Sequence, residues 1–133
     1  MAHPLLKWVA LVLFFGYAAT LVFAGAVGVV AAPFDLSVTA DLEDADASLL
    51  AQHRFLRAVE LVFGFFSLVY WRAIFSRRAV SRVFLAVLGA GAAARLLSLA
   101  VDGVPSAAML SFLGWELVAV VVLLVYTRRT LED

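Results

Sequence analysis

The chain contains neither cysteine nor asparagine, and only 15% of its 133 residues are charged. The absence of cysteine excludes disulfides, thiolate metal sites, thioether-linked haem and palmitoylation. The absence of asparagine excludes N-linked glycosylation. The formal net charge is zero, so there is no basic excess to form a nucleic-acid surface, and no nucleic-acid partner is expected.

Apolar side chains, in contrast, are abundant. Hydrophobic residues make up 65% of the chain, whereas soluble domains carry about half apolar and roughly 25% charged residues. Four long apolar segments account for this excess, and each is close to the ~20 residues that cross a hydrocarbon core as a helix. The composition predicts an all-α integral membrane protein with one membrane domain over residues 1–133. The four membrane helices are expected at about residues 5–32, 49–75, 83–101 and 107–126.

The first apolar segment has an alternative interpretation as a secretory signal peptide. Lys7 precedes an apolar run that ends in small residues, as in such peptides. The run is much longer than the ~7–15 residues of a signal h-region. We therefore predict that residues 5–32 form a membrane helix.

The connections between the apolar segments alternate in charge. The stretch "FSRRAVSR" follows the second segment and "TRRTLED" follows the fourth, and both are rich in arginine. Residues 33–48 hold five acidic side chains and no basic one. Positively charged loops tend to stay in the cytoplasm. This pattern predicts a four-helix antiparallel bundle with both termini cytoplasmic and an acidic outer loop at residues 33–48.

The acidic segment contains "DLEDAD", which has the acidic character of a calcium-binding loop. It lacks the glycine turn and the distal glutamate that such a loop needs. We therefore interpret residues 33–48 as a solvated loop and not as a calcium site.

Small residues stand at positions where helix backbones could approach one another. Ala24 and Gly28 in the first segment and the stretch "GAGAAAR" in the third have this composition. No strand precedes the two glycines of that stretch, so it is not a phosphate-binding loop. Close helix packing is the expected role of these positions.

Polar and ionisable side chains also occur within the apolar segments. A lone charge at the bilayer centre costs ~2.5–3.5 kcal/mol on insertion scales, so such side chains usually face the bundle interior or a wet cavity. At ~100° per residue, each predicted helix gathers its polar positions on one face. The candidate site residues are Tyr17 in the first segment, His53, Arg57 and Glu60 in the second, Arg95, Ser98 and Asp102 in the third and Glu116 in the fourth.

The two arginines and two glutamates of this set are expected at similar depths. A rise of ~1.5 Å per residue places them about 10–15 Å below the outer ends of their helices. Arg57 is expected to pair with Glu60 or Glu116. Arg95 is expected to pair with Glu116 or Asp102, since guanidinium groups suit carboxylates well. The cluster either only sets the helix register or forms a functional polar site.

Three stretches of the chain resemble a known family. They are "HRFLRAVELVFG", "ARLLSLAVDGVPS" and "WEL", and they are similar to the small bacterial four-helix membrane proteins grouped as domain of unknown function 4345. This family is itself similar in outline to the DoxX-like proteins. The resemblance covers nearly the whole chain and implies four spans and a multi-pass protein of the bacterial cytoplasmic (inner) membrane, but no activity. Its most telling residues are Arg57, Arg95-Leu96-Leu97-Ser98, Asp102-Gly103, Pro105-Ser106 and Glu116.

Glu60 departs from this resemblance, because a glycine-rich and uncharged stretch is expected around it. The carboxylate of Glu60 is therefore interpreted as particular to this chain.

The sequence favours a non-enzymatic bundle with a polar pocket that opens outward. Such a protein would serve as an accessory subunit of a larger membrane complex, or bind a small amphiphile such as a lipid, a quinone, a carotenoid or a sterol-like molecule. One alternative is a membrane isomerase or reductase of a lipid-like substrate, with Glu60, Glu116 and His53 as proton-transfer groups. Another is a proton-coupled transporter, although four spans would have to dimerise to enclose a path.

The expected partners are membrane lipids, with a larger membrane complex or a second copy of the chain as further hypotheses. His53 is expected near the membrane interface, with a general-base role as the less favoured interpretation. No motif identifies a metal or a cofactor, because His3 and His53 are too far apart to share a site. The cofactor therefore stays unknown at this point.

Overall fold

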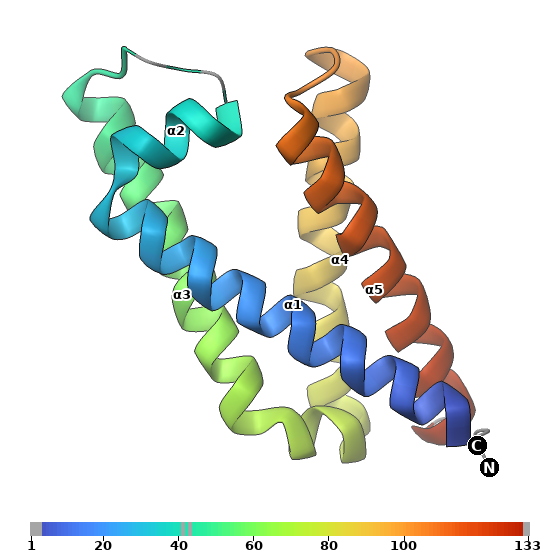
Figure 1. Cartoon of the computed structure of the whole chain (residues 1–133). Coiled ribbons are helices and arrows are strands. Elements are labelled where there is room, and N and C mark those ends of the chain that lie inside the picture. Colours follow the sequence, from blue (N-terminus) through green and yellow to red (C-terminus); the bar gives the residue numbers. More distant parts are fainter. Residues whose placement is uncertain (1–3, 41, 43, 132–133) are drawn as a thin grey trace.

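The computed structural model describes residues 4–40, 42 and 44–131, and nearly all of them are helical (Figure 1). Within this part of the chain there are five helices and no strand. The helices are α1 (Pro4–Val30), α2 (Ala32–Ala40), α3 (Ala47–Ser76), α4 (Arg78–Val101) and α5 (Ala107–Leu131).

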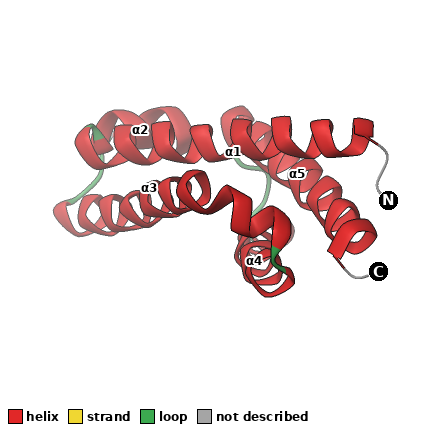
Figure 2. Ribbon diagram, turned by 90° about the horizontal axis from the view of Figure 1, so that it is seen from below, coloured by secondary structure: helices red, strands yellow, loops and turns green. Residues whose placement is uncertain are grey.

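Four of the helices, α1, α3, α4 and α5, are long and apolar enough to cross a membrane. They run in alternating directions and form a bundle (Figure 1). Each packs against two others, in the ring α1, α3, α4, α5 and back to α1. The view from below shows α1 and α4 on opposite sides of this ring (Figure 2). The prediction of an all-α, multi-pass membrane bundle with four spans is confirmed.

Short local signals set the ends of these helices. Asp46 caps the start of α3, where its Oδ1 accepts a hydrogen bond of 2.7 Å from the backbone N–H of Leu49. A single extended residue, Arg77, separates α3 from α4. After α4 the chain turns at Gly103, whose φ of 101° favours glycine. The arginine-rich stretch between the second and third segments is itself largely helical, so α4 begins before the predicted start at residue 83.

The prediction of a loop over the whole of residues 33–48 is wrong, because its first part belongs to α2. The chain bends at Ala31 and then resumes a helix. Pro33 is tolerated there because the first turn of a helix needs no N–H from it. Ser106 ties the far end of α2 to the start of α5, since its Oγ donates a hydrogen bond of 2.6 Å to the backbone oxygen of Thr39.

The apolar core lies in the half of the bundle remote from α2. Phe14 of α1 is fully buried and contacts the rings of Phe75 and Phe84 with centroid distances of 5.1 and 5.4 Å. Leu88 and Leu123 close the same cluster from α4 and α5. The buried charged side chains of Asp35, Arg57 and Glu116 lie in the other half of the bundle.

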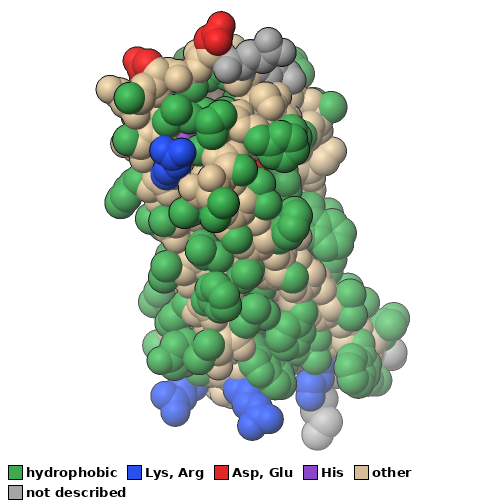
Figure 3. Space-filling view, turned by 60° about the vertical axis from the view of Figure 1, so that its left-hand side comes forward, with side chains coloured by type: hydrophobic (Ala, Val, Ile, Leu, Met, Phe, Trp, Pro, Cys, Tyr) green, Lys and Arg blue, Asp and Glu red, His purple; other side chains and the backbone are tan. Residues whose placement is uncertain are grey.

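The two ends of the bundle carry opposite charges. Most Lys and Arg side chains visible in Figure 3 gather at its lower end, and the visible Asp and Glu side chains lie toward its upper end. Hydrophobic side chains cover the surface between them, as expected for a lipid-facing belt. The start of α1, the turn at Arg77 and the end of α5 all lie at the basic end (Figure 1).

We predict that this basic end faces the cytoplasm, because arginine-rich connections resist translocation. Alkaline phosphatase fused at Asp44 should be active, and the same enzyme fused after the last residue should be inactive. A fluorescent protein that folds only in the cytoplasm should give the reverse pattern. An active phosphatase at the C-terminus would show that the orientation is wrong.

Candidate functional site

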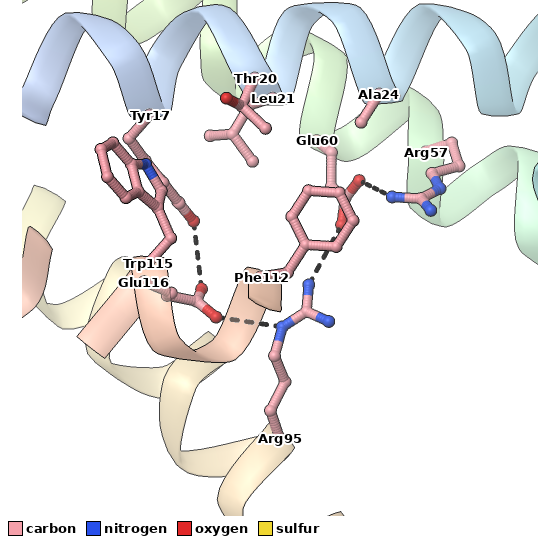
Figure 4. Close-up of a pocket in the computed structure, with 10 residues that line it drawn as sticks. All are labelled: Tyr17, Thr20, Leu21, Ala24, Arg57, Glu60, Arg95, Phe112, Trp115 and Glu116. Carbon is pink, nitrogen blue, oxygen red and sulfur yellow. Dashed lines mark hydrogen bonds and ion pairs between the residues drawn. The ribbon is translucent and has the colours of Figure 1, made fainter. Parts of the chain in front are cut away.

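Ionisable side chains from three spans form a row across the interior of the bundle, which we call the charge row (Figure 4). It consists of Arg57 and Glu60 of α3, Arg95 of α4 and Glu116 of α5. Arg57 Nη1 donates a hydrogen bond of 2.6 Å to Glu60 Oε2. Glu60 Oε1 lies 3.8 Å from Arg95 Nη2, and Arg95 Nε lies 3.0 Å from Glu116 Oε2. Positive and negative groups therefore alternate along the row.

The remaining span, α1, contacts the charge row through Tyr17. Its hydroxyl donates a hydrogen bond of 3.1 Å to Glu116 Oε1 (Figure 4). One oxygen of Glu116 thus has a donor from α1, while the other faces Arg95 from α4. The four spans are linked by polar contacts in this half of the bundle.

The outer end of the row is held by Asp35 of α2. Arg57 Nε donates a hydrogen bond of 2.7 Å to Asp35 Oδ2, and His53 Nε2 lies 2.6 Å from the same oxygen. Asp35 is only 6% exposed. Its carboxylate therefore joins α2 to α3 at two points, and Arg57 is shared between Asp35 and Glu60.

Glycines make room for the longest of these side chains. A Cβ at Gly28 of α1 would collide with the side chain of Arg57, and a Cβ at Gly91 of α4 would lie 3.0 Å from Glu116 Oε1. Gly25 of α1 instead allows close contact with the backbone of α3. Of the small residues singled out in the sequence, Gly28 and Gly91 make room for charged side chains, whereas the close approach of helix backbones occurs at Gly25, which was not singled out.

The charge row lines a cavity of about 30 Å³ (Figure 4). A buried water needs about 10–15 Å³ by this measure, so the space suits a very small polar group. The cavity shares Thr20, Phe112 and Trp115 with a neighbouring cleft of about 330 Å³ between α1 and α5. This cleft lies on the apolar outer surface, where Trp115 is 42% exposed. The polar cavity is thus adjacent to a lipid-facing cleft.

Two groups in the cavity have unused hydrogen-bonding capacity. Glu116 Oε2 is buried and accepts no hydrogen bond from the described residues, because the nearby Nε–H of Arg95 is not directed at it. Arg95 Nη1 donates only to the sulfur of Met109, at 3.2 Å, and a thioether is a weak acceptor. Each group can therefore bind a further partner.

The match to a known family extends over most of the chain. The sequence pattern of domain of unknown function 4345 matches residues 5–127, which include nearly all of the four spans and the whole charge row. The chain belongs to this family. Comparison with curated proteins and with solved structures gives no match. The resemblance to family 4345 is confirmed, whereas the likeness to DoxX-like proteins stays a prediction.

The structure of this family-4345 protein shows which of the expected arginine–carboxylate pairs form in the charge row. Arg57 pairs with Glu60 and not with Glu116. Arg95 faces Glu116 and, at a longer distance, Glu60. Asp102 takes no part, because it is exposed and accepts a hydrogen bond of 2.8 Å from Ser98 Oγ. Asp102 and Ser98 therefore lie outside the cavity lined by the row.

One placement differs from the interpretation of the sequence. Asp35 is expected in a solvated loop, but it is buried against Arg57. His53 lies near the start of α3 and contacts Asp35 with its side chain 13% exposed, and its place near the membrane interface stays a prediction. The missed signal is the sequence "APFD", since proline followed by an acidic residue is typical of the first turn of a helix.

No three His, Cys, Asp or Glu side chains among the described residues gather in a way that could hold a metal ion. His3, Asp41 and Glu43 lie outside the residues that the structure describes. The polar cavity itself is lined by two arginines, two carboxylates and a tyrosine.

Proposed function

We propose that this protein binds a small amphiphile of the membrane, with the polar head in the cavity of the charge row and the apolar chain in the cleft between α1 and α5. The observation that carries this proposal is that Thr20, Phe112 and Trp115 line both the polar interior cavity and the apolar outer cleft, so the two are adjacent. Binding sites for small molecules commonly combine an apolar lining with a few convergent polar groups.

The depth of the cavity supports access from the membrane. Glu116 lies roughly 14 Å along α5 from its start, at ~1.5 Å per residue. A ligand at that depth can arrive sideways from the hydrocarbon core without crossing the polar surface. The small cavity restricts the head to one or two polar groups, as in a quinone or a sterol-like molecule, and the larger cleft accepts an apolar chain.

The proposal includes location in a bacterial cytoplasmic membrane, in keeping with the family resemblance and the basic end of the bundle. A role as accessory subunit of a larger complex is the rival class. The exposed apolar side chains fit a lipid environment as well as a protein partner, so they do not favour this rival.

The test is purification in mild detergent from native membranes, followed by mass spectrometry of the intact complex. We expect a small amphiphile bound at one copy per chain. Ala108→Phe should abolish its retention, because Ala108 lines the cleft between α1 and α5. Ala58→Phe is the matched control, since Ala58 lines a separate apolar depression on α3.

Equal retention of the amphiphile by the two variants would overturn the proposed binding site. A stoichiometric protein partner with no bound small molecule would favour the accessory-subunit role and overturn amphiphile binding.

A further inference from the structure

We infer that the head of the bound amphiphile is a neutral hydroxyl group, which donates to Glu116 and accepts from Arg95, and that anionic heads are rejected. This inference rests on the proposed function and specifies the class of ligand that the same cavity takes.

Glu116 has a buried oxygen that can accept a hydrogen bond from a ligand. Glu116 is 5% exposed, and its Oε2 atom accepts no hydrogen bond from the described residues. A buried acceptor without a partner is costly, and most buried polar atoms in proteins have one. Glu116 Oε1 already has the hydroxyl of Tyr17. Glu116 Oε2 lies 3.0 Å from Arg95 Nε but accepts no hydrogen bond from the described residues, so it can accept one from an O–H or N–H group of a ligand.

Arg95 has N–H donors that are available to a ligand. Its guanidinium carries five N–H donors, and the only hydrogen bond found for them among the described residues goes to the sulfur of Met109. The distance of 3.8 Å from Nη2 to Glu60 is too long for a hydrogen bond. The side chain of Arg95 is 33% exposed, so a ligand can reach it. A hydroxyl both donates and accepts, and it suits this arginine and Glu116 together.

The charge of the connected cluster disfavours an anionic head. Three carboxylates, those of Asp35, Glu60 and Glu116, face the two guanidinium groups of Arg57 and Arg95. The cluster thus has one carboxylate more than it has guanidinium groups, and its other ionisable members are His53 and Tyr17. An anionic head would add a further negative charge beside Glu116 in a site of low dielectric. A carboxylate or phosphate head is therefore disfavoured.

The test uses Trp115, which lines both the cavity and the cleft, as a fluorescent reporter. Trp8→Phe and Trp71→Phe leave Trp115 as the single tryptophan. Three probes with the same brominated twelve-carbon chain would be titrated in mild detergent: the alcohol, the primary amine and the carboxylic acid. The Trp115→Phe variant, which keeps the other two tryptophans, measures quenching by general partition into the micelle.

We expect saturable quenching of Trp115 by the alcohol, with a Kd at least ~10-fold lower than that of the carboxylate, as follows from one hydrogen bond to a charged group. The protonated amine can only donate, so its Kd should lie between the two. Glu116→Gln should weaken binding of the alcohol and reduce the difference between the alcohol and the carboxylate.

The two proposals fail in different ways. Saturable quenching by all three probes with equal Kd, or tighter binding of the carboxylate, would overturn the hydroxyl inference and leave amphiphile binding intact. Tightest binding of the amine would show that the head is a cation and not a neutral hydroxyl. Quenching by all three probes that never exceeds the micelle control would overturn both proposals.

Discussion

Replacing Arg57 with leucine is expected to lower the free energy of unfolding by about 3 kcal/mol. The side chain of Arg57 is only 7% exposed, and it bridges Asp35 at 2.7 Å and Glu60 at 2.6 Å. Removal of one member of a buried ion pair typically costs ~3–5 kcal/mol, because the remaining charge is left uncompensated. The lower end of that range applies here, since Asp35 retains His53 and Glu60 retains Arg95.

Equilibrium unfolding in mixed micelles of a mild detergent and sodium dodecyl sulfate would measure this loss. Arg54→Leu is the matched control, because Arg54 lies on the same helix but is exposed and donates only a long hydrogen bond of 3.3 Å to the backbone oxygen of Val29. It should cost less than ~1 kcal/mol. The variant that replaces Arg57, Asp35 and Glu60 together by apolar residues should recover part of the loss. Equal losses from Arg54→Leu and Arg57→Leu would contradict the buried bridge.

A second large effect is expected at the contact between α1 and α3. Gly25→Ala should destabilise the bundle by about 1–3 kcal/mol, the usual cost of overpacking. A Cβ at Gly25 would lie 2.6 Å from the backbone nitrogen of Leu61 and 2.8 Å from the backbone oxygen of Arg57. Backbone atoms cannot rotate away, so the two helices would have to separate. That separation would also disturb the placement of Arg57.

Gly114→Ala provides the comparison for this change. Gly114 also lies within a helix, but a Cβ added there meets nothing within 4 Å. Alanine is the better helix former, so this variant should be neutral or more stable by up to about 1 kcal/mol. The same unfolding titration applies. If the two alanine variants unfold alike, the close approach of α1 and α3 does not limit stability.

The four spans were predictable because each depends on the composition of one continuous segment. A run of some twenty apolar residues must form a helix in a membrane, since its backbone groups have no other partner there. The bend before Pro33 was harder to predict. Residues 33–48 hold mainly acidic and small side chains, which a solvated loop and a short helix share. The helix α2 packs against α1, α3 and α5, and these contacts add to the local signal of Pro33 and Asp35 in stabilising it.

Most of the charged groups inside the bundle were also predictable from the sequence, but the buried Asp35 was missed, and Ser98 and Asp102 were included although they are exposed. Helical periodicity gathers Arg57 and Glu60 on one face of their segment, and the same rule applies to Arg95 on the third. Depth along each helix then brings the arginines and glutamates to similar levels. None of these steps needs contacts between helices.

The partners within that set were decided by the tertiary structure. The sequence allowed two carboxylate partners for each arginine. The rotation and crossing of the helices determine which of them it meets. Close contact at Gly25 and Gly28 sets α1 against α3, where Arg57 turns toward Glu60 and Asp35. The sequence alone thus determined that this protein spans the membrane four times and carries charge within it. Only the folded bundle decided which charges meet, because pairing depends on distances of a few ångströms between segments far apart in the chain.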